Sequence, residues 1–449
     1  MPHPSPPPPE SSEYLIALSM RKLARDIFDR ALAECSIPTA FVRYLSYESG
    51  QLHIGDHVYD LATFTRVAVV SIGKAGHRMA EALSKIVPVG ISGIVACPTP
   101  PPSPVAGFRY FYGGHPLPNG DSLRAGSAIL EFLYALPERS LVLFLISGGA
   151  SAVAEHPIDP DLTLSDIVTT YRALVHSGAP IAEINAIRKH LSAIKGGRMA
   201  QAATPVTQVS LLVSDVPDHA LDALASGPTM PDSSTVSDCD AIAERYGMFS
   251  HFPERVRAMF EGGKLQETPK PGDMAFGNSR YVTVLSNQTA VSAAADRAKL
   301  VGFEVVVDNH CDDWDYEQAA DYLLARLRPL RQTSSPVCLI SGGEVTVKIG
   351  DNSGMGGRNQ QFALYCAERI AGEAITVLSA GTDGIDGNSP AAGAVVDGGT
   401  VSRARQRGLQ ALAALSQFDT FPLLESIGDA IVTGPTGNNV RDLRILLAY

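Results

Sequence analysis

The stretch LVLFLISGGASA (141–152) indicates the fold class of this chain. Its opening run of apolar, partly β-branched residues is typical of a strand buried on both faces, and the serine and glycines that follow predict a tight turn. Helical stretches lie between this run and others like it, which predicts an α/β fold with mostly parallel sheets. Five further apolar runs stop on a serine in the same way: VAVV before Ser71, VSLLV before Ser214, VTVL before Ser286, VCLI before Ser341 and ITVL before Ser379.

The ends of these strands form the expected ligand-binding edge. In open α/β sheets, ligands bind just beyond the carboxyl ends of the strands. A short residue followed by glycine lets backbone N–H groups approach an anion, and the N-terminus of the following helix adds partial positive charge. The sequence therefore predicts a crevice that binds phosphate or carboxylate groups.

The length of 449 residues and the 45% hydrophobic composition favour two domains. We expect a disordered, proline-rich tail over residues 1–11, an N-terminal Rossmann-like α/β domain over 12–260, and a C-terminal α/β domain over 278–449. The polar, glycine-bearing stretch between the two domains marks the boundary. The second domain is expected to end in a helix that begins at Asn439.

Charge and apolar patterning argue against several classes of partner. The net charge is −11 without a basic run, which disfavours nucleic acid and anionic membranes. The longest purely apolar stretch, 141–146, is too short to cross a bilayer, and the N-terminus has no apolar core of a signal peptide. The six cysteines lack paired spacings, which indicates buried thiols in a reducing cytosol and predicts a cytoplasmic location. The sequence leaves a homodimer open.

Two glycine turns of the first half are candidate anion sites. In SIGKAG (71–76), Lys74 follows Gly73 in a turn between a strand and a helix, where a lysine can serve as a mobile point charge for phosphate. The alternative is a solvated surface lysine. In SGGAS, Ser147 precedes the pair Gly148 and Gly149, which suits an anion-binding nest or simply a sharp turn.

The second half repeats this chemistry. SGGE places Gly342 and Gly343 at a matching strand end, so the same two interpretations apply. In GGRNQ, Gly357 precedes Arg358 at the start of a helix, where an arginine can form bidentate bonds to a transferring phosphoryl group. A structural arginine is the alternative.

A basic helix is expected within INAIRKHLSAIKGG (184–197). Arg188, Ser192 and Lys195 are spaced i, i+4, i+7, which would place two cations and a hydroxyl on one helix face before the glycine pair ends the helix. Such a face suits a carboxylate. Solvated cations on a surface helix are the alternative.

Three aspartates follow predicted strands. Asp215 lies at a strand end, where a carboxylate can hold Mg²⁺ beside phosphate oxygens or cap a helix. Asp383 and Asp386 lie in the glycine-rich loop GTDGIDG (381–387), which lacks the full pattern of a calcium loop.

Taken together, these stretches resemble the class II glycerate kinases, also called the glycerate 2-kinase family, whose C-terminal half is the MOFRL domain. The similarity runs from about Tyr14 to the C-terminus. It implies ATP-dependent phosphorylation of D-glycerate at its 2-hydroxyl, with a divalent metal, in a cleft between two α/β domains. The motifs that carry it are SIGKAG (71–76), GGHPLPN (113–119), ISGGASA (146–152), INAIRKHLSAIKGG (184–197), SDV and ASGPT (214–229), GGRNQ (356–360), GTDGIDG (381–387) and TGPTGNNVRDL (433–443).

The resemblance allows each candidate residue to be given a role as a hypothesis. Lys74 and Arg358 would stabilise charge on the transferring γ-phosphoryl group, and Asp383 would orient the hydroxyl or hold Mg²⁺. Asp215 and Asp386 are the further candidates for the Mg²⁺ ligands. Glycerate would contact Arg188, Lys195, Ser147 and Asn185, and ATP would contact the turns at Gly73, Gly148, Gly149, Gly342, Gly343 and Gly357.

The sequence also bears on two rival functions. An NAD(P)H-dependent hydroxypyruvate reductase needs a G-x-G-x-x-G fingerprint after a strand, with an acidic residue about twenty positions on, and the sequence has none. A non-catalytic sugar-phosphate-binding module would share the anion-binding turns. Retention of both candidate catalytic cations argues against it.

Overall fold

The computed structural model describes residues 12–88, 90–333, 336–350 and 354–449. The proline-rich tail expected over residues 1–11 lies outside the described residues. The chain forms two compact units. One unit is Ile37–Val284, and the other combines the described residues up to Ser36 with Leu285–Tyr449.

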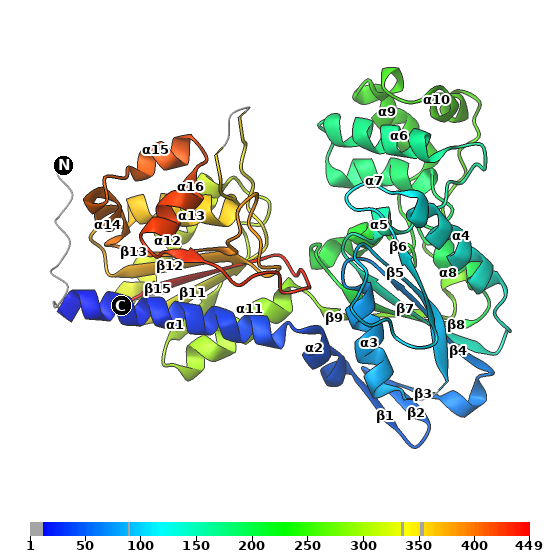
Figure 1. Cartoon of the computed structure of the whole chain (residues 1–449), viewed down its shortest axis with the longest axis horizontal. Coiled ribbons are helices and arrows are strands. Elements are labelled where there is room, and N and C mark those ends of the chain that lie inside the picture. Colours follow the sequence, from blue (N-terminus) through cyan, green and yellow to red (C-terminus); the bar gives the residue numbers. More distant parts are fainter. Residues whose placement is uncertain (1–11, 89, 334–335, 351–353) are drawn as a thin grey trace. The chain divides into compact units, whose positions relative to one another are not determined.

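The unit Ile37–Val284 contains a six-stranded sheet in the order β6-β5-β4-β7-β8-β9 (Figure 1). β4 pairs in parallel with β5 and β7, and the parallel pairing continues to β6 and β8. The strand ends expected at Ser71, Ser147 and Ser214 are confirmed. The strands are β4 (Arg66–Ile72), β5 (Ile91–Cys97), β6 (Phe108–Tyr112), β7 (Ser140–Ser147), β8 (Thr207–Val213) and β9 (Ser279–Leu285).

Helices and a small antiparallel sheet complete this unit. α4 and α6 begin with capping boxes at Asn119 and Thr163. The apolar faces of α4, α5 and α8 pack against β4 and β7, while α6, α7, α9 and α10 form a separate core cluster. The helices are α2 (Ile37–Tyr44), α3 (Gly76–Ile86), α4 (Gly120–Tyr134), α5 (Ala150–Val153), α6 (Leu164–His176), α7 (Ile181–His190), α8 (Arg198–Ala202), α9 (Val236–Arg245) and α10 (Glu254–Glu261), and the small sheet is β1 (Leu45–Glu48), β2 (Gln51–Ile54) and β3 (His57–Asp60).

The other unit also contains a six-stranded sheet, in the order β10-β11-β15-β12-β13-β14. Among the described strands of this unit only β10 and β11 pair in parallel, because β15 runs antiparallel to both of its neighbours and β13 antiparallel to β12 and β14. The expectation of mostly parallel sheets is therefore wrong for this unit. Its strands are β10 (Glu304–Val307), β11 (Val337–Gly342), β12 (Ile375–Gly381), β13 (Gly393–Asp397), β14 (Ala430–Ile431) and β15 (Asp442–Ala448).

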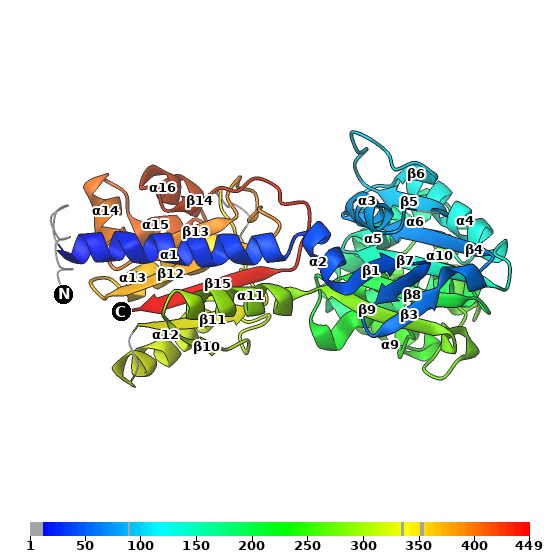
Figure 2. The ribbon, with the colours of Figure 1, turned by 90° about the horizontal axis from the view of Figure 1, so that it is seen from below.

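The helix expected from Asn439 is likewise wrong, since β15 occupies this segment as a fully buried central strand. α1 (Ser12–Glu34) packs with α11 (Asn287–Leu300) on one face of the sheet (Figure 2), through Ile27 and Phe28 among others. α1 therefore packs in the unit that is formed mainly by Leu285–Tyr449, whereas the sequence analysis placed it in the N-terminal domain. The remaining helices are α12 (Tyr316–Thr333), α13 (Arg358–Arg369), α14 (Thr400–Gln406), α15 (Ala411–Ser416) and α16 (Thr420–Ser426).

All six cysteines are buried free thiols, as expected. Among the described helices, none has the length and apolar character that crossing a membrane requires.

Candidate active site

The candidate site lies where the strand order of the parallel sheet reverses. Successive strands run outward from β4 through β5 to β6, and from β7 through β8 in the other direction, so the switch point lies between β4 and β7. Ligands of open α/β sheets bind at such points, outside the carboxyl ends of the strands. Lys74 follows β4 and Gly148 follows β7, and the Lys74 amide donates to the Gly148 carbonyl at 2.9 Å.

Glycine is required at two positions of these turns. Gly73 has φ +116°, and a Cβ there would lie 2.5 Å from the Ser147 carbonyl oxygen. Gly149 has φ +80°, and a Cβ there would lie 2.9 Å from His115 Cδ2 and 3.0 Å from Lys74 Cγ. The side chains of Lys74 and His115 therefore lie directly against the Gly149 backbone.

The charge of Lys74 is available at this edge. Lys74 is exposed, and within the described part of the chain no carboxylate pairs with its ammonium group. Burial lowers the pKa of His115, and the Lys74 charge lowers it further, so the imidazole is neutral near pH 7. The carboxylate of Asp215 lies over Gly148, because a Cβ at Gly148 would overlap it.

A cavity of about 490 Å³ opens beside these turns. Its lining contains cationic and neutral side chains but no aspartate or glutamate. In a chain of net charge −11, such a cavity is suited to an anion. The lining residues are His115, Pro116, Leu117, Gly149, Ser151, Ala152, Tyr171, Arg172, Val175, His176 and Arg188.

Arg188 is the most informative residue of this cavity. Its guanidinium stacks on the ring of Tyr171, with Cζ 4.7 Å from the ring centroid. Its Nε is buried without a hydrogen-bond partner, and among the described residues no carboxylate forms an ion pair with it. Burial lowers the pKa of Arg188, an effect that Tyr171 and Glu155 partly oppose. A half-buried guanidinium without a carboxylate partner is suited to bind a carboxylate or phosphate ligand.

Lys195 does not share this role. Its side chain is 2% exposed and forms an ion pair with the buried carboxylate of Glu155. Glu155 also accepts hydrogen bonds from the Tyr171 hydroxyl and from Ser192 Oγ, the latter at 2.6 Å. The Lys195 charge is therefore already neutralised inside the protein and is not presented to a ligand.

The helical spacing expected for Arg188, Ser192 and Lys195 is also wrong. α7 ends at His190, so Ser192 and Lys195 lie beyond the helix. They converge on Glu155 instead of forming a face with Arg188. This buried cluster holds the Tyr171 ring on which Arg188 stacks.

The other two substrate candidates lie behind the cavity surface. Ser147 Oγ accepts from the Ala75 amide at 3.1 Å and joins the β7 end to the Lys74 turn. Asn185 is buried, and its Oδ1 accepts from Ser226 Oγ at 3.2 Å. Ser226 in turn contacts Ser151, which lines the cavity.

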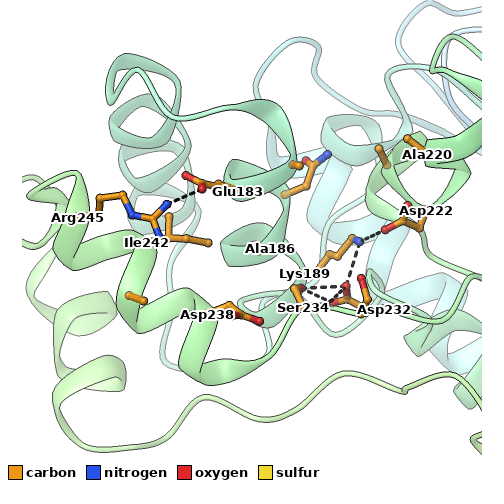
Figure 3. A pocket seen from close by; sticks show the side chains of 15 residues that line it. Glu183, Ala186, Lys189, Ala220, Asp222, Asp232, Ser234, Asp238, Ile242 and Arg245 are labelled. Atoms are coloured by element: carbon orange, nitrogen blue, oxygen red, sulfur yellow. Dashed lines mark hydrogen bonds and ion pairs between the residues drawn. The ribbon is translucent and has the colours of Figure 1, made fainter.

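A second cavity of about 400 Å³ lies on the Asn185 side of α7. Figure 3 shows that its charged side chains face one another: Lys189 lies between Asp222 and Asp232, at 3.0 and 3.1 Å, and Arg245 pairs with Glu183 at 2.7 Å. Because its cations are paired, this cavity is less suited to bind an anion than the one at Arg188.

In the other unit, Arg358 is held by carboxylates. Its Nε and Nη2 donate to both oxygens of Asp442, at 2.5 and 3.0 Å, and Nη2 also contacts Glu344 at 2.8 Å. Burial lowers the pKa of Arg358, but the hydrogen bond and charge of Asp442 outweigh this effect and raise it above its usual value. The side chain remains 37% exposed. The structure thus shows a fixed guanidinium with two carboxylate partners.

Asp386 caps a helix in this structure. Its oxygens accept from the amides of Asn359 and Gln360 at the start of α13, at 3.1 and 2.9 Å, and from both side-chain amides. A Cβ at Gly357 would overlap Asp386, so this glycine makes room for the cap. With its oxygens occupied and the residue buried, Asp386 does not fit a Mg²⁺ ligand, and Gly357 has a structural reason to be glycine.

The SGGE turn is occupied by side chains. The amide of Gly342 donates to Asn309 Oδ1 at 2.8 Å, and that of Gly343 to Asn287 Oδ1 at 2.9 Å. These two amides are therefore not free to cradle a phosphate. SGGAS and SGGE are similar in sequence, but the structure does not support the same anion-binding role for SGGE.

Asp383 lies close to the Arg358 cluster. A Cβ at Gly381 would be 3.1 Å from an Asp383 oxygen and 3.3 Å from an Asp442 oxygen, so both carboxylates lie over this glycine. Asp383 Oδ1 accepts from the Ile385 amide at 3.1 Å. Within the described ranges, no group of three or more His, Cys, Asp or Glu side chains is arranged to hold a metal ion.

Sequence reasoning missed several residues of the cavity. His115 lies in the motif GGHPLPN (113–119), which the sequence analysis identified without predicting that His115 lines the cavity. Glu155, Tyr171 and Ser226 lie 16 to 75 positions from the side chains that they contact here, and no local pattern reveals such pairs. Ser151 is part of SGGAS, in which the sequence analysis singled out Ser147 and the glycines as candidates but not Ser151.

Comparisons with known proteins agree with this architecture. Residues 23–261 match a domain of unknown function (DUF4147), and residues 337–442 match the MOFRL family. A Thermotoga maritima protein named D-glycerate 2-kinase is 37% identical over 387 residues, covering 85% of this chain and 90% of the relative. An Agrobacterium vitis protein provisionally named hydroxypyruvate reductase is 37% identical over 438 residues, covering 96% and 95%. The crystal structure of a glycerate kinase from Thermotoga maritima superposes with a TM-score of 0.84 at 34% identity, covering 96% of this chain and 100% of that one.

The fold and the matches define a protein with a DUF4147 region followed by a MOFRL region, both of α/β type. The chain belongs to the class II glycerate kinase family, which confirms the resemblance found in the sequence.

Proposed function

We propose that this protein is an ATP-dependent glycerate 2-kinase, which transfers the γ-phosphoryl group of ATP to the 2-hydroxyl of D-glycerate and yields 2-phosphoglycerate and ADP. The observation that supports this most strongly is the cavity beside the β4–β7 switch point, which no described aspartate or glutamate lines, where Arg188 has no carboxylate partner among the described residues and Lys74 is exposed. Relatives covering most of the chain bear the corresponding names.

Arg188 binds the glycerate carboxylate in this mechanism. Its planar fork matches a carboxylate bidentately, and the Tyr171 ring fixes the plane of the guanidinium. The neighbouring polar groups of the cavity then meet the hydroxyls. Fixing the acid in this way brings its 2-hydroxyl into a single orientation, and positioning is the main requirement of phosphoryl transfer.

Lys74 neutralises charge on the migrating phosphoryl group. Its flexible stem lies over Gly149, so the ammonium can follow the phosphate from ATP to product. Such a cation acts mainly in the transition state and lowers the barrier by an estimated 3 kcal/mol or so. The backbone at Gly73, Gly148 and Gly149 leaves room for phosphate oxygens.

Arg358 is the second cation that we assign to ATP. Its contacts with Asp442 and Glu344 hold the guanidinium in one orientation while the side chain stays partly exposed. Asp383, beside the same cluster, is our candidate for orienting the attacking hydroxyl. Kinetics of single and double variants of Arg358 and Asp383 test both assignments.

Mg²⁺ fits one residue of the first unit better than the other candidates. Asp215 is partly buried over Gly148, at the turn proposed to meet phosphates, and Mg²⁺ usually takes one or two carboxylates together with phosphate oxygens and water. When bound, the ion neutralises charge on the phosphate oxygens of ATP. Asp386 is excluded from this role by its helix-capping bonds. The buried thiols support our inference that the protein works in the reducing cytoplasm.

A coupled assay that separates 2-phosphoglycerate from 3-phosphoglycerate tests the proposal. Wild-type protein with ATP, Mg²⁺ and D-glycerate should give 2-phosphoglycerate, and Arg188→Gln should raise KM by about a hundredfold. Arg245→Gln is the matched control, because Arg245 lies at the second cavity and should leave the kinetics unchanged.

The same preparation tests the reductase alternative that one relative's name suggests. NADH and hydroxypyruvate should give no turnover, since no dinucleotide fingerprint follows a strand in this sequence. Oxidation of NADH at a rate matching or exceeding the kinase rate would reverse the choice between the two functions.

A further inference from the structure

A strained turn lies behind the cavity that contains Arg188. Ala225, Ser226 and Gly227 have φ values of +55°, +59° and +59°, a region that residues other than glycine rarely adopt. Ser226 is 1% exposed, and its carbonyl accepts from the Gly196 amide at 3.0 Å, so the surrounding structure imposes this conformation. Backbone strain of this kind is unfavourable and is typically kept where it has a function.

The strain fixes a chain of three polar side chains. Ser151 Oγ lies 2.9 Å from Ser226 Oγ, and Ser226 Oγ donates to Asn185 Oδ1 at 3.2 Å. An amide oxygen can only accept, and a hydroxyl has a single proton to donate. Ser226 has used its proton on Asn185, so in the contact with Ser151 it must accept.

This direction determines what Ser151 offers to the cavity. Its proton points back to Ser226, so its free lone pairs face the space that Arg188 and Gly149 also line. Ser151 is therefore held as a hydrogen-bond acceptor, whereas the guanidinium groups of the cavity can only donate.

We propose that Ser151 accepts a hydrogen bond from the 3-hydroxyl of glycerate and makes the site selective for acids that have this hydroxyl. The inference rests on the proposed function. The relay behind Ser151 ends on Asn185, an amide that cannot take up a proton, so it cannot remove the proton that the 2-hydroxyl loses on phosphorylation. The hydroxyl that donates to Ser151 is therefore the 3-hydroxyl, which keeps its proton during the reaction. Ser226 and Asn185 act as positioning residues.

The test compares D-glycerate with D-lactate, which lacks the 3-hydroxyl, by calorimetric binding and by turnover. Ser151→Ala should weaken glycerate binding about tenfold and lactate binding less than about twofold. Ser226→Ala should also change the ratio of glycerate affinity to lactate affinity, because it frees the Ser151 proton while leaving Ser151 in place. Asn185→Asp, which keeps an accepting oxygen, should retain the preference for glycerate.

Ser233→Ala is the matched control, since Ser233 is an exposed serine of the second cavity. Equal weakening of glycerate and lactate in Ser151→Ala, or an unchanged ratio, would overturn the inference while leaving the kinase proposal intact. A wild-type protein that binds glycerate but never phosphorylates it would refute the proposed function and leave the binding ratio as a valid test. Absence of glycerate binding to the wild type would overturn both.

Discussion

Replacing Glu155 by glutamine tests the buried cluster that supports Arg188. Glu155 is fully buried and accepts from four donors: Lys195 Nζ, the Tyr171 hydroxyl, Ser192 Oγ and the His156 amide. Glutamine keeps the shape but removes the charge and replaces one accepting oxygen by a donor. The Lys195 ammonium, whose side chain is 2% exposed, then stays in the interior without a counter-charge.

The structure sets the size of the effect. Breaking a buried ion pair by removing one partner costs about 3–5 kcal/mol, because the remaining charge is desolvated without compensation. For a unit of this size, each kcal/mol lowers Tm by about 2–4 °C, so Glu155→Gln should lower the Tm of the unit Ile37–Val284 by roughly 6–20 °C. Arg188 should also lose its fixed ring partner, which raises the KM for glycerate.

Differential scanning calorimetry measures the first effect and steady-state kinetics the second. Glu81→Gln is the control, because the Glu81–Lys85 pair lies on the surface and contributes less than about 1 kcal/mol. The double variant Glu155→Gln, Lys195→Gln should recover part of the loss, since no uncompensated charge remains. A Glu155→Gln protein whose Tm and KM both match those of the control would refute the reasoning.

Three further predictions follow from the site and its surroundings. Arg188→Lys should raise the KM for glycerate about tenfold with a smaller change in kcat, because an ammonium cannot reproduce the bidentate fork; initial rates over a range of glycerate concentrations check this. Lys74→Met should lower kcat about a hundredfold with little change in nucleotide affinity, as measured by turnover and by calorimetric titration. Burial raises the pKa of Asp386 from 3.8 to about 6, so the folded state takes up a proton before the unfolded state does, and lowering the pH from 7 to 5 should add about 1 kcal/mol of stability that Asp386→Asn does not gain. Denaturant unfolding of both proteins at the two pH values measures the difference, and identical pH dependence would contradict the assignment.

The sequence predicted the parts of the fold that local patterns determine. Each of the six apolar runs forms a strand that ends within about two residues of its serine, because buried strand segments need continuous apolar residues and end at polar turns. β15 escaped prediction because Arg444 interrupts its apolar run. The structure buries this arginine completely, and its Nη2 donates to the Gly342 carbonyl at 2.6 Å.

The sequence did not predict which segments far apart in the chain pack together, because local patterns carry no information about distant partners. α1 has an apolar face that fits any sheet of suitable shape, and nothing local says that its partner lies about 270 residues further on, where Arg297 pairs with Asp26. In the site, Lys74 and Arg188 were found because they lie in recognisable motifs. The neutralisation of Lys195 by Glu155 depends on a contact across 40 positions, so spacing alone misjudged it.

The central claim is that one cavity, with Arg188 on its wall and Lys74 at its edge, directs phosphate to a single hydroxyl of glycerate. Phosphorus NMR of the product formed from ATP, Mg²⁺ and D-glycerate tests it most directly. The account predicts 2-phosphoglycerate from the wild type, and less than about one hundredth of that rate when Lys74→Met and Arg188→Gln are combined. Formation of 3-phosphoglycerate, or an unchanged rate in the double variant, would contradict it.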